Sequence, residues 1–357
     1  MKKLILLYIF FLHIHSINAQ RLDTSIVHSM EAAIENGTYS NIHSILIDHD
    51  SKIIYEKYWT GIDRTGEGYN TAVMKHGADS LHEIQSITKS FVSACVGIAL
   101  QQGKIKSIDE KIFDFFPEYA VQDTGLKAQI TIKDLLTMSA GFQWNEEDYS
   151  KTGNSEHLMD SAFDPVAYVL SLPMNNVPGT VFTYTGGETQ LLAAIVEKAT
   201  GKTIDVFAKE YLFTPLGITN FKWTSCTNSD RIDAFSGLVL HSRDMMKFGL
   251  LYMNDGRWNS KQIIPANWVK ESTTPQIKVN DAAGTEYGFQ IWLWKDTILN
   301  KPMDMVAFLG NGGQRIFIDK KNQMVVVFTA GNYRMTNLNI NSYLVLTKFI
   351  YPAVFNK

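Results

Sequence analysis

The sequence predicts an α/β (α+β) fold: an antiparallel sheet of about five strands, built from both ends of the chain and flanked by helices, with a mostly helical domain inserted. Three observations predict it. β-Rich runs lie near the start, at 43–59, and near the end, at 303–329, and the segment between them carries apolar residues at helical spacing. The cleft between sheet and insertion is the expected place for chemistry.

The chain begins with a helix and a hairpin. From Leu22 to about Glu35 the apolar residues recur at helical spacing. "HSILIDHDSKIIYEKYW" follows, with two β-rich runs on either side of the turn-like Asp48-His49-Asp50-Ser51. This pattern predicts a hairpin.

The middle of the chain is predicted to be helical. The expected helices are Ser86 to Gln102 closed by Gly103, one from Thr131, one from Gly187 ending at Gly201, and two more in "SRDMMKFGLLYMNDG" and "PANWVKEST". We therefore expect a sheet domain from 20–80 and 230–357 and a helical domain from 81–229.

The end of the chain returns to strands. "MDMVAFL", "QRIFID" and "QMVVVFT" predict three strands, the last two joined by the polar turn from Asp319 to Asn322. "LNINSYLVLTKFIYPAVF" predicts a closing helix. Both ends of the chain then contribute to one layer.

Composition limits the function classes. The 357 residues are 45% hydrophobic with a formal net charge of −3, enough for a large core. No basic block or acidic tail is present, which argues against nucleic acid or an anionic membrane surface as partner. A small or neutral substrate is expected.

The N-terminus, "MKKLILLYIFFLHIHSINAQ", is typical of a cleavable signal peptide. We place it at residues 1–19, cut after Ala19, which predicts a secreted or periplasmic protein. The apolar run from Leu4 to Leu12 is too short to span a bilayer, so no stable membrane insertion is expected after cleavage; a retained anchor is the alternative. The sequence leaves open whether Cys95 and Cys226 form a disulfide.

Ser86-Ile87-Thr88-Lys89 is a Ser-x-x-Lys sequence at the start of the first long apolar helix. Residues i and i+3 are neighbours on a helix surface. A Ser at a helix start lies where the helix dipole favours an oxyanion, and a Lys whose pKa is lowered by burial can accept the Ser proton. The alternative is a helix-capping Ser with a Lys that reaches solvent.

Two further segments fit such a site. Tyr184 ends the extended "TVFTY" before a Gly-Gly turn and a helix, a geometry that presents its phenol, although a core Tyr is the alternative. "FLGNGGQRIFI" is a glycine-rich turn in which a backbone N–H near Asn311 could complete an oxyanion hole with that of Ser86. A plain hairpin turn is the alternative there.

In this order the three segments resemble the serine β-lactamase and penicillin-binding-protein superfamily, closest to class C β-lactamase-like esterases and the 6-aminohexanoate-dimer hydrolase group. "IQSITKSF", "ITIKDLLTMSAGFQW", "PLGITNFKW" and "GNGGQ" are among the similar phrases, which extend over nearly all of the mature chain. The resemblance implies a β-lactamase/transpeptidase-like fold. It implies Ser86 as acylating nucleophile, Lys89 as its proton acceptor, Tyr184 as proton relay and activator of water, and Asn311, to within one residue, as the second oxyanion donor.

The sequence departs from that family at two places. The middle motif is commonly Tyr-x-Asn, but Gly186 stands at the third position. The last motif is commonly Lys-Thr-Gly or His-x-Gly, but Ala307-Phe308-Leu309 carries no cation that could hold a substrate carboxylate. Both departures favour ester or amide substrates that lack this carboxylate.

Other kinds of site find less support. No Gly-x-Ser-x-Gly occurs, and the nine His show no His-x-x-x-His or His-x-His after the signal, so no metal site and no cofactor are predicted. His241 and Asp244 are expected to fix a helix start. Glu188 and Arg315 are expected in solvated or structural roles.

The leading hypothesis is an exported serine hydrolase that acts on a small ester or amide through an acyl-enzyme. One alternative is a D,D-peptidase or β-lactamase acting on cell-wall peptides or β-lactams. The other is a non-catalytic binding protein on the same scaffold. The natural substrate and the oligomeric state are left open by the sequence.

Overall fold

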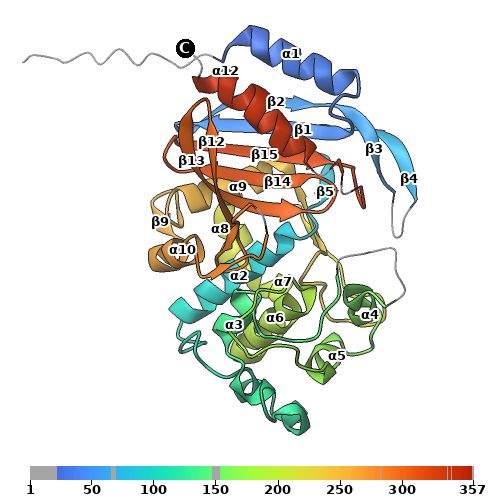
Figure 1. The fold of residues 1–357 in the computed structure, drawn as a ribbon, viewed down its shortest axis with the longest axis vertical. Coiled ribbons are helices and arrows are strands. Elements are labelled where there is room, and N and C mark those ends of the chain that lie inside the picture. The colour runs from blue at the N-terminus through green and yellow to red at the C-terminus, as the bar shows by residue number, and fades with distance from the viewer. Residues whose placement is uncertain are drawn as a thin grey trace, which may run out of the picture.

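The main sheet combines strands from both ends of the chain (Figure 1). The computed structural model describes residues 22–65, 70–146, 153–281, 283–335, 337–338 and 340–355. The predicted signal peptide, residues 1–19, lies outside the described residues. The described strands are β1 (Ile42–His49), β2 (Lys52–Tyr58), β3 (Thr60–Arg64), β4 (Thr71–Lys75), β5 (Leu81–Glu83), β6 (Lys222–Trp223), β7 (Leu238–His241), β8 (Arg257–Trp258), β9 (Lys261–Gln262), β10 (Ile277–Lys278), β11 (Glu286–Tyr287), β12 (Trp292–Ile298), β13 (Lys301–Gly310), β14 (Gln314–Asp319) and β15 (Met324–Ala330).

Helices cover the sheet and fill the middle of the chain. The described α-helices are α1 (Thr24–Glu35), α2 (Ile87–Gln101), α3 (Ile132–Leu136), α4 (Ser155–Asp160), α5 (Pro165–Ser171), α6 (Gly186–Thr200), α7 (Ile204–Ala208), α8 (Thr214–Leu216), α9 (Ser242–Met253), α10 (Ala266–Ser272), α11 (Asn341–Val345) and α12 (Tyr351–Phe355). Short 3₁₀ helices are η1 (Ile112–Asp114), η2 (Pro117–Gln122) and η3 (Lys127–Gln129), and π-helical turns are η4 (Lys209–Phe213) and η5 (Leu346–Ile350).

The strand order of the main sheet is β10-β11-β12-β13-β14-β15-β1-β2, with antiparallel neighbours throughout. The predicted fold class is confirmed. The sheet has eight described strands rather than about five, because β10, β11 and β12 extend it beyond the predicted five. Two of these additions are only two residues long and the third is interrupted by the polar run Lys295-Asp296-Thr297, so none stands out in the sequence.

The predicted hairpin at the start of the sheet is formed by β1 and β2. Asp50 and Ser51 connect the strands, with φ of 53° and 60°, both in the left-handed region. Two consecutive residues of positive φ are typical of the tight type I′ turn, whose twist matches that of the flanking strands. The turn therefore fixes the register of the edge hairpin.

Both faces of the sheet are buried. Along β1, Ile45 and Ile47 face one hydrophobic cluster, while Leu46 between them faces another. The first cluster packs under α1 and the closing helix, and the second under α2 and α9. The closing helix runs from α11 through η5 into α12, as Figure 1 shows above the sheet.

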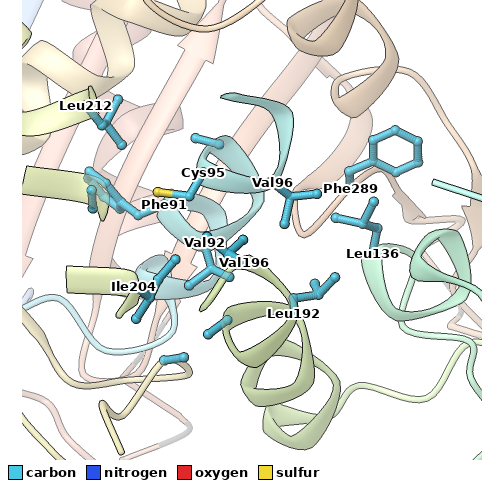
Figure 2. Close-up of a cluster of buried hydrophobic side chains, with 14 of the residues drawn as sticks. Phe91, Val92, Cys95, Val96, Leu136, Leu192, Val196, Ile204, Leu212 and Phe289 are labelled. Atoms are coloured by element: carbon cyan, nitrogen blue, oxygen red, sulfur yellow. The ribbon is translucent and has the colours of Figure 1, made fainter. Parts of the chain in front are cut away.

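The core below the sheet is centred on α2 (Figure 2). Phe91, Val92, Cys95 and Val96 of α2 meet side chains of α3, α6, α7, η4 and the loop before β12. The same cluster reaches the lower face of the sheet, so one core links the sheet to the helical region. The predicted domain limits at residues 81 and 229 stay a prediction.

Several local features differ from the expectation or were left open by the sequence. The helix predicted from Thr131 is only five residues long, because Met138, two residues after its end, has a φ of 56°. Cys95 and Cys226 are both buried and free, without a disulfide between them. Among the described residues, none of the helices has the length and hydropathy needed to cross a membrane.

Candidate active site

Ser86 lies in the tight connection between β5 and α2. The residue before it, Gln85, has a φ of 52°, a strained conformation for a residue with a side chain. Thr88 Oγ1 donates to the Gln85 carbonyl over 2.7 Å and closes this turn. The Ser86 side chain makes no capping hydrogen bond to α2 and is partly exposed. The helix-capping alternative therefore does not describe Ser86.

Lys89 meets Ser86 one turn further along α2. Lys89 Nζ donates to Ser86 Oγ and to the Phe235 carbonyl, each over 2.9 Å. The side chain is only 1% exposed, so it does not reach solvent. Asp233 holds the loop that supplies this carbonyl, because its Oδ1 accepts from the N–H groups of Phe235 and Ser236. The ammonium group is thus fixed from two sides against the Ser86 hydroxyl.

Tyr184 completes the group from the segment that leads into α6. Its ring centroid lies 5.0 Å from Lys89 Nζ, and both Ser86 and Lys89 act on its phenol to lower its pKa. Thr185, the next residue, caps α6 by accepting from the Gly187 N–H over 3.0 Å. Trp292 of β12 packs against the Tyr184 ring at 5.5 Å. Tyr184, which is far from Ser86 and Lys89 in the sequence, therefore lies beside this pair.

The charge of Lys89 differs from the expectation. Burial acts to lower the pKa of Lys89, as predicted, but electrostatic interactions with Tyr184 and Glu146 outweigh it and raise that pKa above its ordinary value. The pKa of Tyr184 is also raised, by burial first, although Lys89 acts in the opposite direction. With Lys89 protonated, the Lys89–Tyr184 pair can accept the Ser86 proton only after it loses one proton itself.

Two acids, Glu146 and Glu156, lie together beside Tyr184, and the sequence analysis did not predict this pair. Glu146 Oε2 accepts from the Gly186 N–H and from Trp144 Nε1, each over 2.8 Å. Burial and the negative charge of Glu146 raise the pKa of Glu156 well above its ordinary value, and a hydrogen bond joins the two carboxyl groups. Neither acid belongs to a motif, and about forty residues separate Glu146 from Gly186, so only the fold reveals the pair.

The structure gives a physical reason for Gly186, which stands where the family commonly has asparagine. A Cβ at this position would lie 3.1 Å from Glu156 Oε2 and 3.2 Å from the Phe235 side chain. Both distances are shorter than an ordinary contact, so a larger residue would displace one neighbour. The carboxyl group of Glu156 occupies the space beside Gly186, where the family commonly has the asparagine side chain.

The glycine-rich turn with Asn311 approaches the segment that leads to Ser86. A Cβ on Gly310 would lie 2.3 Å from the Ile84 carbonyl, so the two backbones are in direct contact. Asn311 Oδ1 accepts from the Arg334 N–H over 3.2 Å. This hydrogen bond involves the side chain of Asn311 and does not engage its backbone N–H. The role of that N–H as an oxyanion donor stays a prediction.

Arg315 braces this turn from β14. Its Nη1 donates to the carbonyls of Gly310 and Gln314, over 2.5 and 2.7 Å. Burial lowers the pKa of Arg315 to about 10, and the group interacts electrostatically with Tyr184. The cation therefore has a structural position, as expected, but it lies closer to the site than the sequence indicated.

The position of the family's usual cation is apolar. Phe308 is fully buried against Phe248 and Tyr252, with ring centroids 5.3 and 5.1 Å away. Glu188, also expected outside the chemistry, is buried in α6 and accepts from the Ala140 N–H over 3.2 Å. Burial raises the pKa of Glu188 well above its ordinary value, so this carboxyl group is neutral.

Two other predicted features lie away from Ser86. His241 precedes the first turn of α9, and its Nδ1 lies 3.0 Å from Asp244 Oδ2, at the helix start as expected. A groove of about 660 Å³ runs along α6 and the loop at 227–232, but Ser86, Lys89 and Tyr184 do not line it. We place the chemistry at Ser86 because the groove brings no nucleophile and base together.

The residues that could hold a metal also lie outside this site. His43, Asp63, His76 and His82 are buried together, with their potential ligand atoms within 4.8 Å of one another. The sequence predicted no metal site because these histidines are scattered along the chain. The fold brings them together into a group that could hold a metal ion, and the absence of a metal site stays a prediction.

A family model and several known proteins match the chain. The family model described as Beta-lactamase matches residues 43–346. A putative D-alanyl-D-alanine carboxypeptidase of Escherichia coli (strain K12) is 26% identical over 185 residues, which are 50% of this chain and 42% of that protein. The chain thus matches less than half the length of this relative.

Two solved structures share the fold. A putative 6-aminohexanoate-dimer hydrolase from Bacillus anthracis has a TM-score of 0.69 and 20% identity, covering 90% of this chain and 81% of that chain. EstCE1, described as a hydrolase with promiscuous acyltransferase activity, has a TM-score of 0.67 and 14% identity, covering 90% and 98%. At these identities the likeness concerns the fold alone.

Proposed function

The chain belongs to the β-lactamase family, and from this premise we propose that it is an exported serine hydrolase that cleaves small esters or amides through an acyl-enzyme. The contact of 2.9 Å between Lys89 Nζ and Ser86 Oγ, with Tyr184 at the same hydroxyl, carries the proposal. Export rests on the signal-like residues 1–19. No cofactor is needed for these steps.

Acylation begins when Ser86 Oγ attacks the substrate carbonyl carbon. The Oγ–C bond forms while the Oγ proton passes to the Lys89–Tyr184 pair, which has lost one proton beforehand. The bond to the leaving group then breaks, and the pair returns the proton to the leaving oxygen or nitrogen. Water repeats the sequence on the acyl-enzyme, which releases the acid and restores Ser86.

The surroundings of the site favour substrates without a carboxylate beside the scissile bond. Phe308 stands where the family commonly has a cation, and Arg315 is engaged by two backbone carbonyls. Glu146 lies on the Gly186 side, where its negative charge would repel a substrate carboxylate. The 6-aminohexanoate dimer, which is named for one of the two solved hydrolases, is joined by an amide bond.

The test compares wild-type protein with Ser86→Ala and with Ser171→Ala, an exposed serine on α5. Each protein is assayed on chromogenic short-chain esters, amides, D-Ala-D-Ala peptides and β-lactams, with mass spectrometry to detect an acyl-enzyme. We expect ester or amide hydrolysis that falls by at least roughly 10³-fold in Ser86→Ala and is unchanged in Ser171→Ala.

Three outcomes would contradict the proposal. Full ester activity in Ser86→Ala would exclude this serine as the nucleophile. Rapid labelling of Ser86 by a fluorescent penicillin at low concentration would favour the peptidase or β-lactamase alternative. A well-folded wild type that reacts with no fluorophosphonate probe would favour the non-catalytic alternative.

A further inference from the structure

A buried group of three histidines and one aspartate lies beside the segment that leads to Ser86. His43 comes from β1, Asp63 from β3, His82 from β5, and His76 directly follows β4. We refer to these four residues as the histidine cluster. All four are nine-tenths or more buried, and their potential ligand atoms lie within 4.8 Å of one another.

Each histidine points an unused nitrogen into the cluster. His43 Nδ1, His76 Nε2 and His82 Nε2 are buried and have no hydrogen-bond partner among the described residues. An unpaired polar atom in the interior costs free energy on the order of 1–3 kcal/mol. Three of them at one point indicate that a further group satisfies them.

The opposite ring nitrogens of His43 and His82 already contact backbone carbonyls. His43 Nε2 lies 3.1 Å from the Ile62 carbonyl, and His82 Nδ1 lies 3.3 Å from the Ser80 carbonyl. A carbonyl can only accept, so these nitrogens carry the proton and the inward nitrogens offer lone pairs. Metal-ligating histidines show this arrangement, with the second N–H donated to a carbonyl.

The aspartate is oriented in the same way. Asp63 Oδ1 accepts from the Arg64 N–H over 2.9 Å, while Oδ2 lies 3.7 Å from His43 Nδ1 and 3.9 Å from His82 Nε2. Lone pairs of the histidines and a carboxylate oxygen therefore face one another in the cluster.

We propose that the histidine cluster is a structural zinc site with the ligands His43, Asp63, His76 and His82. Three imidazoles and one carboxylate, enclosed without an open position, match the closed four-coordinate sites that Zn²⁺ forms. Imidazole also suits Cu²⁺ and Ni²⁺, but those ions prefer tetragonal geometry. A site enclosed on all sides by protein fits a structural metal rather than a catalytic one.

Zinc binding requires a small contraction of the cluster. A tetrahedral ion places its ligand atoms about 3.3 Å apart, so the observed separations have to shorten by roughly an ångström or less for the nearer atoms. The rings of His43 and His76 are stacked, with centroids 3.8 Å apart, and His76 has to tilt out of this stack. Cβ atoms on Gly61 and Gly331 would lie 2.6 and 2.7 Å from the His43 ring, so glycines leave the room this ring needs.

The proposed ion would tie the nucleophile segment to the sheet. His82 lies in β5, four residues before Ser86, whereas His43 belongs to the main sheet and Asp63 to the β3–β4 hairpin. Zinc at this point joins all three elements. We therefore expect the ion to restrain the strained turn at Gln85 without touching the substrate.

The experiment measures zinc bound by the full chain purified without a histidine tag. After exchange into zinc-free buffer, elemental analysis should find about one zinc per chain in wild type and less than about one tenth in His76→Ala and Asp63→Asn. His28→Ala, which removes an exposed histidine on α1, should keep one zinc. Added Co²⁺ should give wild type, but not His76→Ala, the visible absorption of a tetrahedral site.

Folding is checked independently by circular dichroism and by fluorophosphonate labelling of Ser86. A folded wild-type protein that holds less than about one tenth of a zinc ion per chain would contradict the proposal. So would equal zinc in wild type, His76→Ala and Asp63→Asn, since the ion would then lie elsewhere. One equivalent of copper or nickel in place of zinc would refute zinc as the occupant.

Discussion

At the residue scale, the chemistry depends on the charge of one buried lysine. Lys89 Nζ donates to the oxygen that has to lose its proton, and electrostatic interactions with Tyr184 and Glu146 keep the pKa of Lys89 high. A base forms only when the Lys89–Tyr184 pair loses a proton. Because both pKa values are raised, the active form becomes more populated as pH rises, and kcat/KM should increase towards alkaline pH.

Glu146→Gln tests this electrostatic effect. The substitution removes a negative charge that raises the pKa of both Lys89 and Tyr184, while an amide oxygen can still accept from the Gly186 N–H and Trp144 Nε1. The base then forms at lower pH. We expect the acid limb of the kcat/KM profile to move down by roughly one pH unit.

Glu188→Gln is the matched control for that prediction. Glu188 is also buried in this region, but its carboxyl group is neutral, so the substitution changes no charge. The profile of Glu188→Gln should coincide with that of wild type. A limb that stays in place, or moves to higher pH, in Glu146→Gln would show that Glu146 does not set the ionisation of the pair.

At the element scale, α2 is both the centre of the core and the carrier of the nucleophile. Thirteen consecutive residues, from Ile87 to Ala99, are buried, so the helix is enclosed on all sides. Such a helix has no freedom to rotate or shift without disturbing its neighbours. Lys89 and Ser86 are therefore held in register by packing along the whole helix.

Gly97→Ala should disturb this packing. A Cβ on Gly97 would lie 2.5 Å from the ring of Trp268 in α10, which is 2% exposed. Alanine favours the helix by about 1 kcal/mol, but overpacking in a core commonly costs about 1–3 kcal/mol. We expect a net loss of up to about 2 kcal/mol in the free energy of unfolding, measured by urea denaturation.

Trp268→Leu provides the partner for a double-mutant cycle. The smaller side chain leaves room for the added methyl group, so Gly97→Ala should cost less in that background than in wild type. The same loss in both backgrounds would mean that Trp268 is not the source of the strain.

At the scale of the whole molecule, one sheet joins two cores and both ends of the chain. The Asp23 N–H donates to the Ala353 carbonyl over 2.9 Å, which ties the start of α1 to α12. The side chains of β1 alternate between the two clusters, so this strand contributes to both cores. We therefore expect the chain to unfold as one cooperative unit.

Leu46→Ala and Ile45→Ala probe this cooperativity from opposite faces of β1. Each removes a fully buried side chain and should lower the free energy of unfolding by about 2–5 kcal/mol, in a single transition seen by both fluorescence and circular dichroism. Ile53→Ala on β2, where the side chain is 47% exposed, should have a small effect. Two separated transitions, each moved by only one substitution, would show that the cores unfold independently.

Local patterns in the sequence were sufficient for those features that depend on near neighbours in the chain. The hairpin at Asp50 and Ser51, the long helices and the meeting of Ser86 with Lys89 follow from periodicity, turn chemistry and a spacing of three residues. The strands from the two ends of the chain were also recognisable, because their apolar runs exceed what a loop carries. The fold class could therefore be predicted before any contact was known.

The tertiary structure alone decided which distant residues share an environment. Glu146 and Glu156 reach Lys89, and His43, Asp63, His76 and His82 gather at one point, although no spacing in the sequence indicates either group. The sign of the shift at Lys89 depends on that assembly, since burial and neighbouring charges act in opposite directions. A pattern of residues reports local geometry, whereas electrostatic and ligand-binding properties arise from whatever the fold brings within a few ångströms.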